Sequence, residues 1–327
     1  MRGVRKPIFI VAFVCFSLLA GQIPAAAQSW ANGCLYRRAI TIDHTKVPNT
    51  DQANFPVLVS GTYSYLATTA NGGGVTSANG YDILFASDAN GASPLPFEQE
   101  SYNPTTGAIV YWVKLSTVSH TTDAVFYMFY GDSSISTNQS NQTAVWDSNY
   151  KGVWHLPNGS SLTANDSSSN GNNGTITGAT STSGEVDGAA SLNGSGQYIN
   201  VGNGPSFQIA GNALTLEAWL KTSESNPTLY ERILAKEVSG DADPYLAYGI
   251  WRTAGTNVIN FGIATGGAGT LGSVTSASSL SMGTWTHVVG TYDGSNLRIY
   301  LNGSLDSQTS ETGNIITTQY KRAPLLE

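Results

Sequence analysis

The chain has 327 residues, of which 40% are hydrophobic and only 11% are charged, and its formal net charge is −7. A coiled coil or a helical repeat needs abundant Lys, Glu, Leu and Ala, and a nucleic-acid binder needs an excess of Lys and Arg, so the composition argues against these classes. The 36 Gly, 16 Tyr, 10 Phe and 7 Trp favour a folded, β-rich protein with a large core.

Residues 1–27 have the organisation of a cleavable signal peptide. Arg2, Arg5 and Lys6 make the start of the chain basic, an apolar run follows over Ile8–Ala20, and Ala25–Ala27 provides a small-residue cleavage site. The apolar run is too short to span a bilayer comfortably, and no later stretch is apolar enough to do so. We therefore expect a secreted, periplasmic or cell-surface protein with no transmembrane segment in the mature chain.

The segment from about residue 30 to 150 reads as a first β unit, because apolar runs alternate with Gly- and Asn-rich turns. The expected strands are Tyr36–Ile42, Phe55–Ser60, Tyr81–Ala86, Ala108–Leu115 and Ala124–Tyr130. The last of these strands is apolar on both sides, so we expect it to be covered on both faces, as in the middle of a sandwich.

The chain from residue 151 onward reads as a second β unit. Its clearest strands are Gln197–Val201, Leu214–Lys221, Arg232–Lys236, Tyr245–Trp251, Val258–Ala264, Trp285–Tyr292 and Leu297–Leu301. Strict apolar–polar alternation, short strands and Gly/Asn turns predict an antiparallel sandwich or jelly roll. The predicted fold class is therefore all-β, with two consecutive antiparallel β-sandwich domains.

The cysteines and histidines of the sequence predict neither an internal disulfide nor a zinc site. Cys15 leaves with the signal peptide, so Cys34 stands alone in the mature chain and cannot form an internal disulfide. We expect it to be buried or simply unpaired. The four histidines, at positions 44, 120, 155 and 287, are scattered in the sequence, so their spacing predicts no zinc site.

Three stretches of the second unit carry a family likeness. They are residues 154–194 with their Asn- and Gly-rich centre, the strand Leu216–Lys221, and the Trp285–Gly303 hairpin. Their order and spacing resemble laminin-G-like jelly rolls of the concanavalin A-like type. The resemblance implies a two-sheet sandwich, usually a module of secreted proteins that binds sugars or other proteins.

The first unit is similar to a bacterial exported family called domain of unknown function 2341. The resemblance rests on Tyr36–Asp43, Asn54–Val59, Asp82–Phe85 and Tyr127–Gly131, and residues 145–156 resemble the junction at which that domain runs into a jelly roll. The expected division is thus a signal peptide at 1–27, a β sandwich of unknown function at 28–150 and a jelly roll at 151–327. The jelly-roll family usually continues to a closing strand beyond the equivalent of Pro324, so we expect a domain that is incomplete at its carboxyl end.

The loop from Asp166 to Thr175 is the best candidate metal site. Calcium prefers six to eight oxygen ligands from carboxylates, amides and backbone carbonyls. Asp166, Asn170 and Asn173 offer such oxygens on a Gly- and Ser-rich loop, and the family resemblance implies calcium here in some members. The alternative is a polar surface loop without a metal.

No catalytic residue is predicted. Glycosidases of this fold need two carboxylates close together, and no such motif occurs in the sequence. Glu98 and Glu100 alternate, but we interpret them as a solvated sheet face, and Asp241 and Asp243 as turn residues.

Aromatic residues provide the candidate ligand-binding positions. Tyr245, Tyr248 and Trp251 could stack on sugar rings, although packing within the sandwich is the competing interpretation. The leading hypothesis is a non-enzymatic module that binds an extracellular glycan or a surface protein. The alternatives are a glycoside hydrolase of the same superfamily and an architectural segment of a large adhesin-like protein.

Overall fold

The computed structural model describes most of the chain after the expected signal peptide, which lies outside the described residues. The described residues are 30–157, 159, 161–224, 227–237, 246–265, 270–316 and 324–326, with the backbone alone at 270 and 324–326. Contacts divide them into two compact domains. The first domain contains residues 30–153 and Ser167–Ser169, and the second contains residues 154–166 and 170–326.

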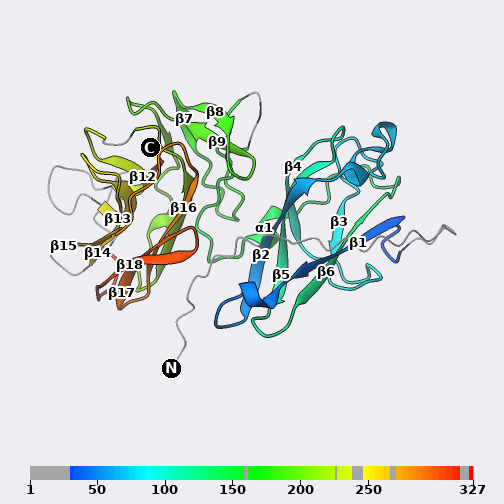
Figure 1. The fold of residues 1–327 in the computed structure, drawn as a ribbon, viewed down its shortest axis with the longest axis horizontal. Helices are drawn as coiled ribbons and strands as arrows, with labels where there is room; N and C mark the ends of the chain where they lie inside the picture. Colours follow the sequence, from blue (N-terminus) through cyan, green and yellow to red (C-terminus); the bar gives the residue numbers. More distant parts are fainter. Residues whose placement is uncertain are drawn as a thin grey trace. The chain divides into compact units, whose positions relative to one another are not determined.

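The first domain consists of two three-stranded antiparallel sheets, with strand orders β1-β6-β3 and β2-β5-β4 (Figure 1). The strands are β1 (Tyr36–Ile42), β2 (Gln52–Thr62), β3 (Leu84–Ala86), β4 (Phe97–Tyr102), β5 (Ala108–Val118) and β6 (Ala124–Tyr130). Helix is limited to short turns, which are η1 (His44–Lys46), η2 (Ser64–Leu66), η3 (Thr69–Asn71) and α1 (Gln142–Val145).

Strand β6 is the centre of its sheet. Phe126 and Met128 pack in the main core of the domain, whereas Phe129 packs on the opposite side with Cys34. Val125 on that opposite side is 44% exposed. The expectation that both faces of this strand are covered is therefore confirmed for one face and only in part for the other. Cys34 is free and buried, as expected.

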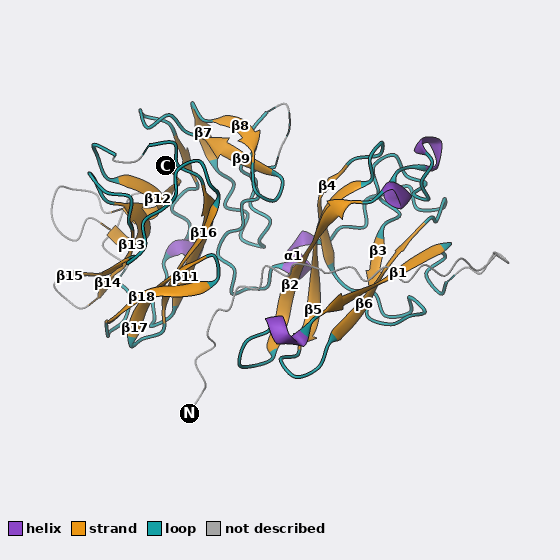
Figure 2. Ribbon diagram, in the orientation of Figure 1, coloured by secondary structure: helices purple, strands orange, loops and turns teal. Residues whose placement is uncertain are grey.

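The second domain places a seven-stranded sheet opposite a four-stranded sheet (Figure 2). The strand orders are β15-β14-β13-β12-β19-β10-β7 and β11-β16-β17-β18, and β8 and β9 form a separate hairpin. The strands are β7 (Thr175–Thr177), β8 (Thr180–Ser183), β9 (Gly188–Ser191), β10 (Tyr198–Asn200), β11 (Leu214–Leu220), β12 (Glu231–Glu237), β13 (Leu246–Arg252), β14 (Ile259–Thr265), β15 (Thr270–Thr275), β16 (Thr286–Tyr292), β17 (Asn296–Leu301), β18 (Ser304–Ser310) and β19 (Pro324–Leu326), and the short helix is η4 (Pro205–Phe207).

The core of the second domain lies between its two large sheets. Leu214 and Leu216 on β11 point into it, whereas Thr215 between them is exposed, so the alternation in the sequence marks the buried face. Every strand pair in the described residues is antiparallel, and the architecture is mostly strand in both domains. The predicted all-β class is therefore confirmed.

Candidate functional site

The predicted calcium loop is held by hydrogen bonds among its own residues. Asp166 is buried, and its Oδ2 accepts a 2.8 Å hydrogen bond from the backbone N–H of Asn172. The Asn173 Oδ1 accepts a 2.9 Å hydrogen bond from the backbone N–H of Asp166. Carboxylate and amide oxygens have a second lone pair, so these bonds fix the loop and remain compatible with cation ligation. Asn170 is exposed on the same loop.

Two of the three predicted sugar-stacking residues are buried. Tyr248 on β13 is 2% exposed and its hydroxyl donates a 3.0 Å hydrogen bond to the Phe207 carbonyl, and burial raises the pKa of Tyr248 well above its ordinary value. Trp251 packs with Ala235 in a small buried cluster. This placement favours the packing interpretation for both residues. Tyr245 lies outside the described residues.

The interpretation of Glu98 and Glu100 as a solvated sheet face is wrong for Glu98. Glu98 on β4 is 4% exposed, and its Oε2 accepts a 2.6 Å hydrogen bond from Trp146 Nε1. Glu100 accepts a 2.7 Å hydrogen bond from Trp112 Nε1. Each carboxylate therefore binds an indole N–H, and the buried indole of Trp146 needs such an acceptor. Asp241 and Asp243 lie outside the described residues.

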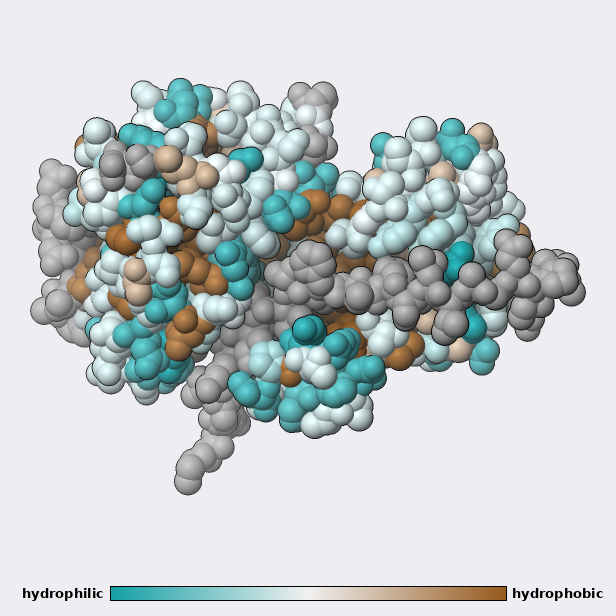
Figure 3. All heavy atoms as spheres, viewed as in Figure 1, coloured by the Kyte–Doolittle hydropathy of each residue, from teal (hydrophilic) through white to brown (hydrophobic). Residues whose placement is uncertain are grey.

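A polar groove of about 380 Å³ lies in the second domain beside the β17–β18 hairpin. Figure 3 shows hydrophilic and hydrophobic residues mixed over the lower left of the molecule, where Figure 1 labels these two strands. The polar lining of the groove comes from the segment before β16, from the start of β16 and from the hairpin. The polar lining residues are Ser278, Ser279, Ser281, Thr286, Asn302, Ser304 and Asp306. Leu280, Leu301 and Leu305 supply apolar surface in the same groove.

The hairpin turn that bounds the groove is specified by Asn302 and Gly303. Their φ angles are 49° and 80°, the left-handed values that a tight two-residue hairpin requires at both positions. Asn302 also pairs with β16, because its Oδ1 accepts a 3.0 Å hydrogen bond from the His287 N–H and its own N–H donates to the His287 carbonyl at 2.9 Å. The turn is thus fixed to the sheet.

Asp306 joins the two walls of the groove. Its Oδ2 accepts a 2.6 Å hydrogen bond from the Ala277 N–H, and its Oδ1 accepts a 3.2 Å hydrogen bond from the Ser278 N–H. These bonds attach the serine-rich segment to β18, so the hydroxyls are presented on a fixed backbone. The groove was not predicted from the sequence. The only sequence signals were the Asn-Gly turn and the serine cluster, and both also occur in ordinary loops.

Two segments of the chain match known families. Residues 79–152 match the family described as Domain of unknown function (DUF2341). Residues 193–326 match the family described as Concanavalin A-like lectin/glucanases superfamily. Along the chain, a match to DUF2341 is thus followed by a match to the concanavalin A-like superfamily. This is the order expected from the sequence, and the jelly-roll architecture of the second domain agrees with it.

The similar solved structures cover about half of the chain. Domain 4 of AbnA, a GH43 extracellular arabinanase from Geobacillus stearothermophilus in complex with arabinotriose, is 20% identical, with 50% of this chain and 76% of that chain covered and a TM-score of 0.36. The CBM40 of the Ruminococcus gnavus IT-sialidase bound to α2,3-sialyllactose is 10% identical, with 46% and 78% covered and a TM-score of 0.33. An S-layer domain-containing protein from Clostridium thermocellum is 21% identical, with 48% and 71% covered and a TM-score of 0.31.

At these identities and TM-scores, the likenesses carry no argument about what this chain binds. The comparison with curated proteins finds no match. Within the part of the chain that the structure describes, no helix is long and apolar enough to cross a membrane.

Proposed function

We propose that the chain is a non-enzymatic binding module of the cell surface or the extracellular space, and that the groove beside the β17–β18 hairpin recognises a carbohydrate. The observation that carries this proposal is the lining of the groove, in which hydroxyl, amide and carboxyl groups surround a few leucines. Sugar hydroxyls both donate and accept hydrogen bonds, and Ser, Thr and Asn side chains do the same. The leucines offer contact to the apolar face of a sugar ring.

The lining also favours binding over hydrolysis. Hydrolysis of a glycosidic bond needs two carboxyl groups on either side of it. Asp306 is the one carboxyl-bearing residue among the described residues that line the groove, and its two oxygens accept backbone hydrogen bonds. The glycoside hydrolase alternative therefore has no support in this groove.

The proposed location rests on the sequence. The basic start, the apolar run Ile8–Ala20 and the Ala25–Ala27 site form the expected signal peptide. Export would deliver the module to extracellular glycans. Export also suits an architectural segment of a large adhesin-like protein, the second candidate, which would bind no glycan itself.

Calcium at the Asp166 loop is a second part of the proposal. It is supported by the buried Asp166 carboxylate and by the amide oxygens of Asn170 and Asn173 on one loop. We expect Ca²⁺ to raise the melting temperature of the EDTA-treated protein, because a ligand that binds only the folded state stabilises it. The Asp166→Asn variant should lose this response. An unchanged melting temperature in saturating Ca²⁺ would remove calcium from the proposal.

A glycan array with the full-length mature protein tests the carbohydrate proposal. Two matched variants, Ser304→Arg and Ser310→Arg, place the same bulky side chain at opposite ends of β18, and both serines are exposed. Ser304 lines the groove and Ser310 does not. Ser304→Arg should abolish binding of the glycans found, while Ser310→Arg should leave it intact. Silence of the array, or equal effects of the two variants, would overturn the proposal, and silence would favour an architectural segment.

A further inference from the structure

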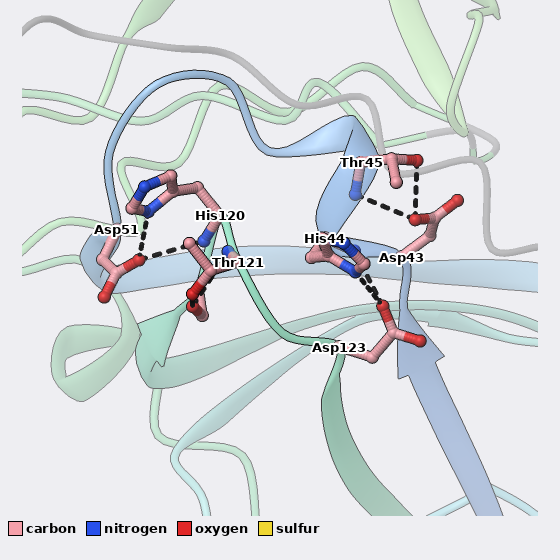
Figure 4. Close-up of polar contacts among 8 residues, drawn as sticks. Asp43, His44, Thr45, Asp51, His120, Thr121 and Asp123 are labelled. Carbon is pink, nitrogen blue, oxygen red and sulfur yellow. Dashed lines mark hydrogen bonds and ion pairs between the residues drawn. The ribbon is translucent and has the colours of Figure 1, made fainter.

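Two loops of the first domain hold each other through a pair of His–Asp contacts (Figure 4). One loop joins β1 to β2 and the other joins β5 to β6. His44 Nδ1 lies 2.6 Å from Asp123 Oδ1, and His120 Nδ1 lies 2.6 Å from Asp51 Oδ1. In both pairs the backbone N–H of the histidine also donates a 3.0 Å hydrogen bond to that same carboxylate oxygen. The two contacts are therefore nearly identical in geometry.

The two pairs differ in one neighbour, Asp43. Ile42 and Ala124 are the last residue pair of the antiparallel ladder between β1 and β6. Asp43 comes directly after Ile42 and Asp123 directly before Ala124, so both lie at the same end of this ladder. One ligand atom from each of Asp43, His44 and Asp123 lies within 4.8 Å of the other two. Among the residues that the structure describes, this is the one such group of three His, Cys, Asp or Glu side chains.

A positive charge would reduce the repulsion between the two carboxylates at this end of the ladder. Like charges on directly opposite positions of neighbouring strands destabilise a sheet. Asp43 is also held in place, because its Oδ1 accepts hydrogen bonds from the Thr45 N–H at 2.9 Å and the Thr45 hydroxyl at 2.7 Å.

We propose that Asp43, His44 and Asp123 bind a divalent transition-metal ion, with Zn²⁺ as the best fit. One imidazole and two carboxylates are a donor set that zinc accepts, and three protein ligands leave a coordination position for water. Ligands at about 2.1 Å from zinc lie roughly 3.5 Å from one another. The exposed side chains of Asp43 and Asp123 can rotate by the small amount needed to reach that spacing.

The ion takes the place of the proton between His44 and Asp123. Binding breaks the hydrogen bond between Nδ1 and Oδ1, forms one bond from the ion to each of these atoms, and releases the Nδ1 proton to solvent. Asp43 supplies the third bond through a carboxylate oxygen. No oxidation or reduction accompanies this exchange.

The second pair gives a control within the same protein. The exposed fractions of the side chains are 38% and 50% for His44 and Asp123, and 37% and 52% for His120 and Asp51. Any ion that merely collects on an exposed His–Asp pair would bind at both places. A site built from three ligands would bind only beside Asp43.

Isothermal titration of ZnCl₂ into EDTA-treated, dialysed full-length protein tests the proposal. We expect one Zn²⁺ per chain, an affinity that falls about tenfold or more in Asp43→Asn and in His44→Asn, and an unchanged affinity in His120→Asn. Melting curves of the metal-free variants establish that each is folded. X-ray absorption of the zinc-loaded wild-type protein should show imidazole among oxygen ligands, which gives a readout that needs no variant.

Three results of the titration would overturn the proposal. They are the absence of a one-to-one Zn²⁺ heat, an affinity in Asp43→Asn equal to that of the wild type, and a loss in His120→Asn as large as that in His44→Asn. An absorption spectrum with oxygen ligands alone would also overturn it, because His44 would then take no part.

Discussion

Trp146 Nε1 donates a 2.6 Å hydrogen bond to Glu98 Oε2, and both side chains are buried in the first domain. The other oxygen of the carboxylate, Oε1, accepts a 2.5 Å hydrogen bond from the Ser167 hydroxyl. Glu98 therefore joins β4 to two segments that are distant in the sequence but belong to the same compact domain.

We expect Glu98→Ala to destabilise the first domain by about 1–3 kcal/mol, because it leaves a buried indole N–H and a buried hydroxyl without their acceptor. Glu98→Gln keeps a carbonyl oxygen at the same place and should cost clearly less. The free energy of unfolding from urea titrations, followed by tryptophan fluorescence, measures both. Equal losses in the two variants would show that the negative charge matters and the acceptor position does not.

Gly290 on β16 lies against the ring of Phe261 on β14, where the two sheets of the second domain pack together. A Cβ at Gly290 would lie 2.4 Å from two carbons of the Phe261 ring, where no real Cβ fits. We expect Gly290→Ala to destabilise the second domain by about 1–3 kcal/mol through overpacking. Adding Phe261→Leu should recover part of this loss.

A double-mutant cycle of Gly290→Ala and Phe261→Leu measures the recovery. Residues in contact show interaction energies of about 0.5–3 kcal/mol, so the double variant should be more stable than the sum of the single changes predicts. If the two free-energy changes add up strictly, the Phe261 ring does not block the methyl group introduced at position 290.

The strands that the sequence analysis recognised are those whose side chains alternate or are apolar throughout. Alternation reveals β11 because one of its faces is buried and the other faces solvent. The strands β4, β7, β8, β9, β15 and β18 were missed, and each has only one neighbouring strand. Edge strands are polar because they have only one neighbour, so their composition resembles that of loops.

The candidate sites were harder to predict than the strands, because they depend on strand order. Trp251 is buried although a tryptophan on a strand could equally face a ligand, and its strand turns out to be in the interior of a seven-stranded sheet. His44 and Asp123 are 79 residues apart and meet only because β1 pairs with β6. The interpretation of the histidines as scattered was true of the sequence, and the fold brings His44 next to two carboxylates.

Cys34 should be unreactive in the native protein. Burial, with smaller contributions from Asp132 and Asp82, raises the pKa of the thiol to about 12. The thiolate is the reactive form, so almost none is present at pH 8. We expect a thiol reagent such as Ellman's reagent to label the mature chain slowly in buffer and rapidly above the urea concentration that unfolds the first domain. Rapid labelling in buffer would mean that the cysteine is accessible in the native state.

The contact between Asp51 and His120 predicts how the first domain responds to acid. The His120 N–H and then its ring hydrogen-bond the Asp51 carboxylate and lower its pKa below the ordinary 3.8. A carboxyl group whose pKa is lower in the folded state stabilises the fold at any pH above its unfolded pKa of about 3.9. That stabilisation is lost as the pH falls from there through the folded pKa, because the unfolded chain then takes up the proton first.

Asp51→Asn removes the titrating group, so the melting temperature of this variant should lie below that of the wild type at pH 5–7. The difference should shrink as the pH falls below about 4, where the wild-type carboxylate is itself being protonated. Thr121 lies beside His120 in the other loop, and Thr121→Ala changes no titrating group, so the difference of this variant from the wild type should stay constant over the same range. Melting curves in EDTA from pH 7 to about 2.5 measure these differences without interference from bound metal. A difference for Asp51→Asn that persists undiminished to the lowest pH would show that the charge of Asp51 does not stabilise the contact.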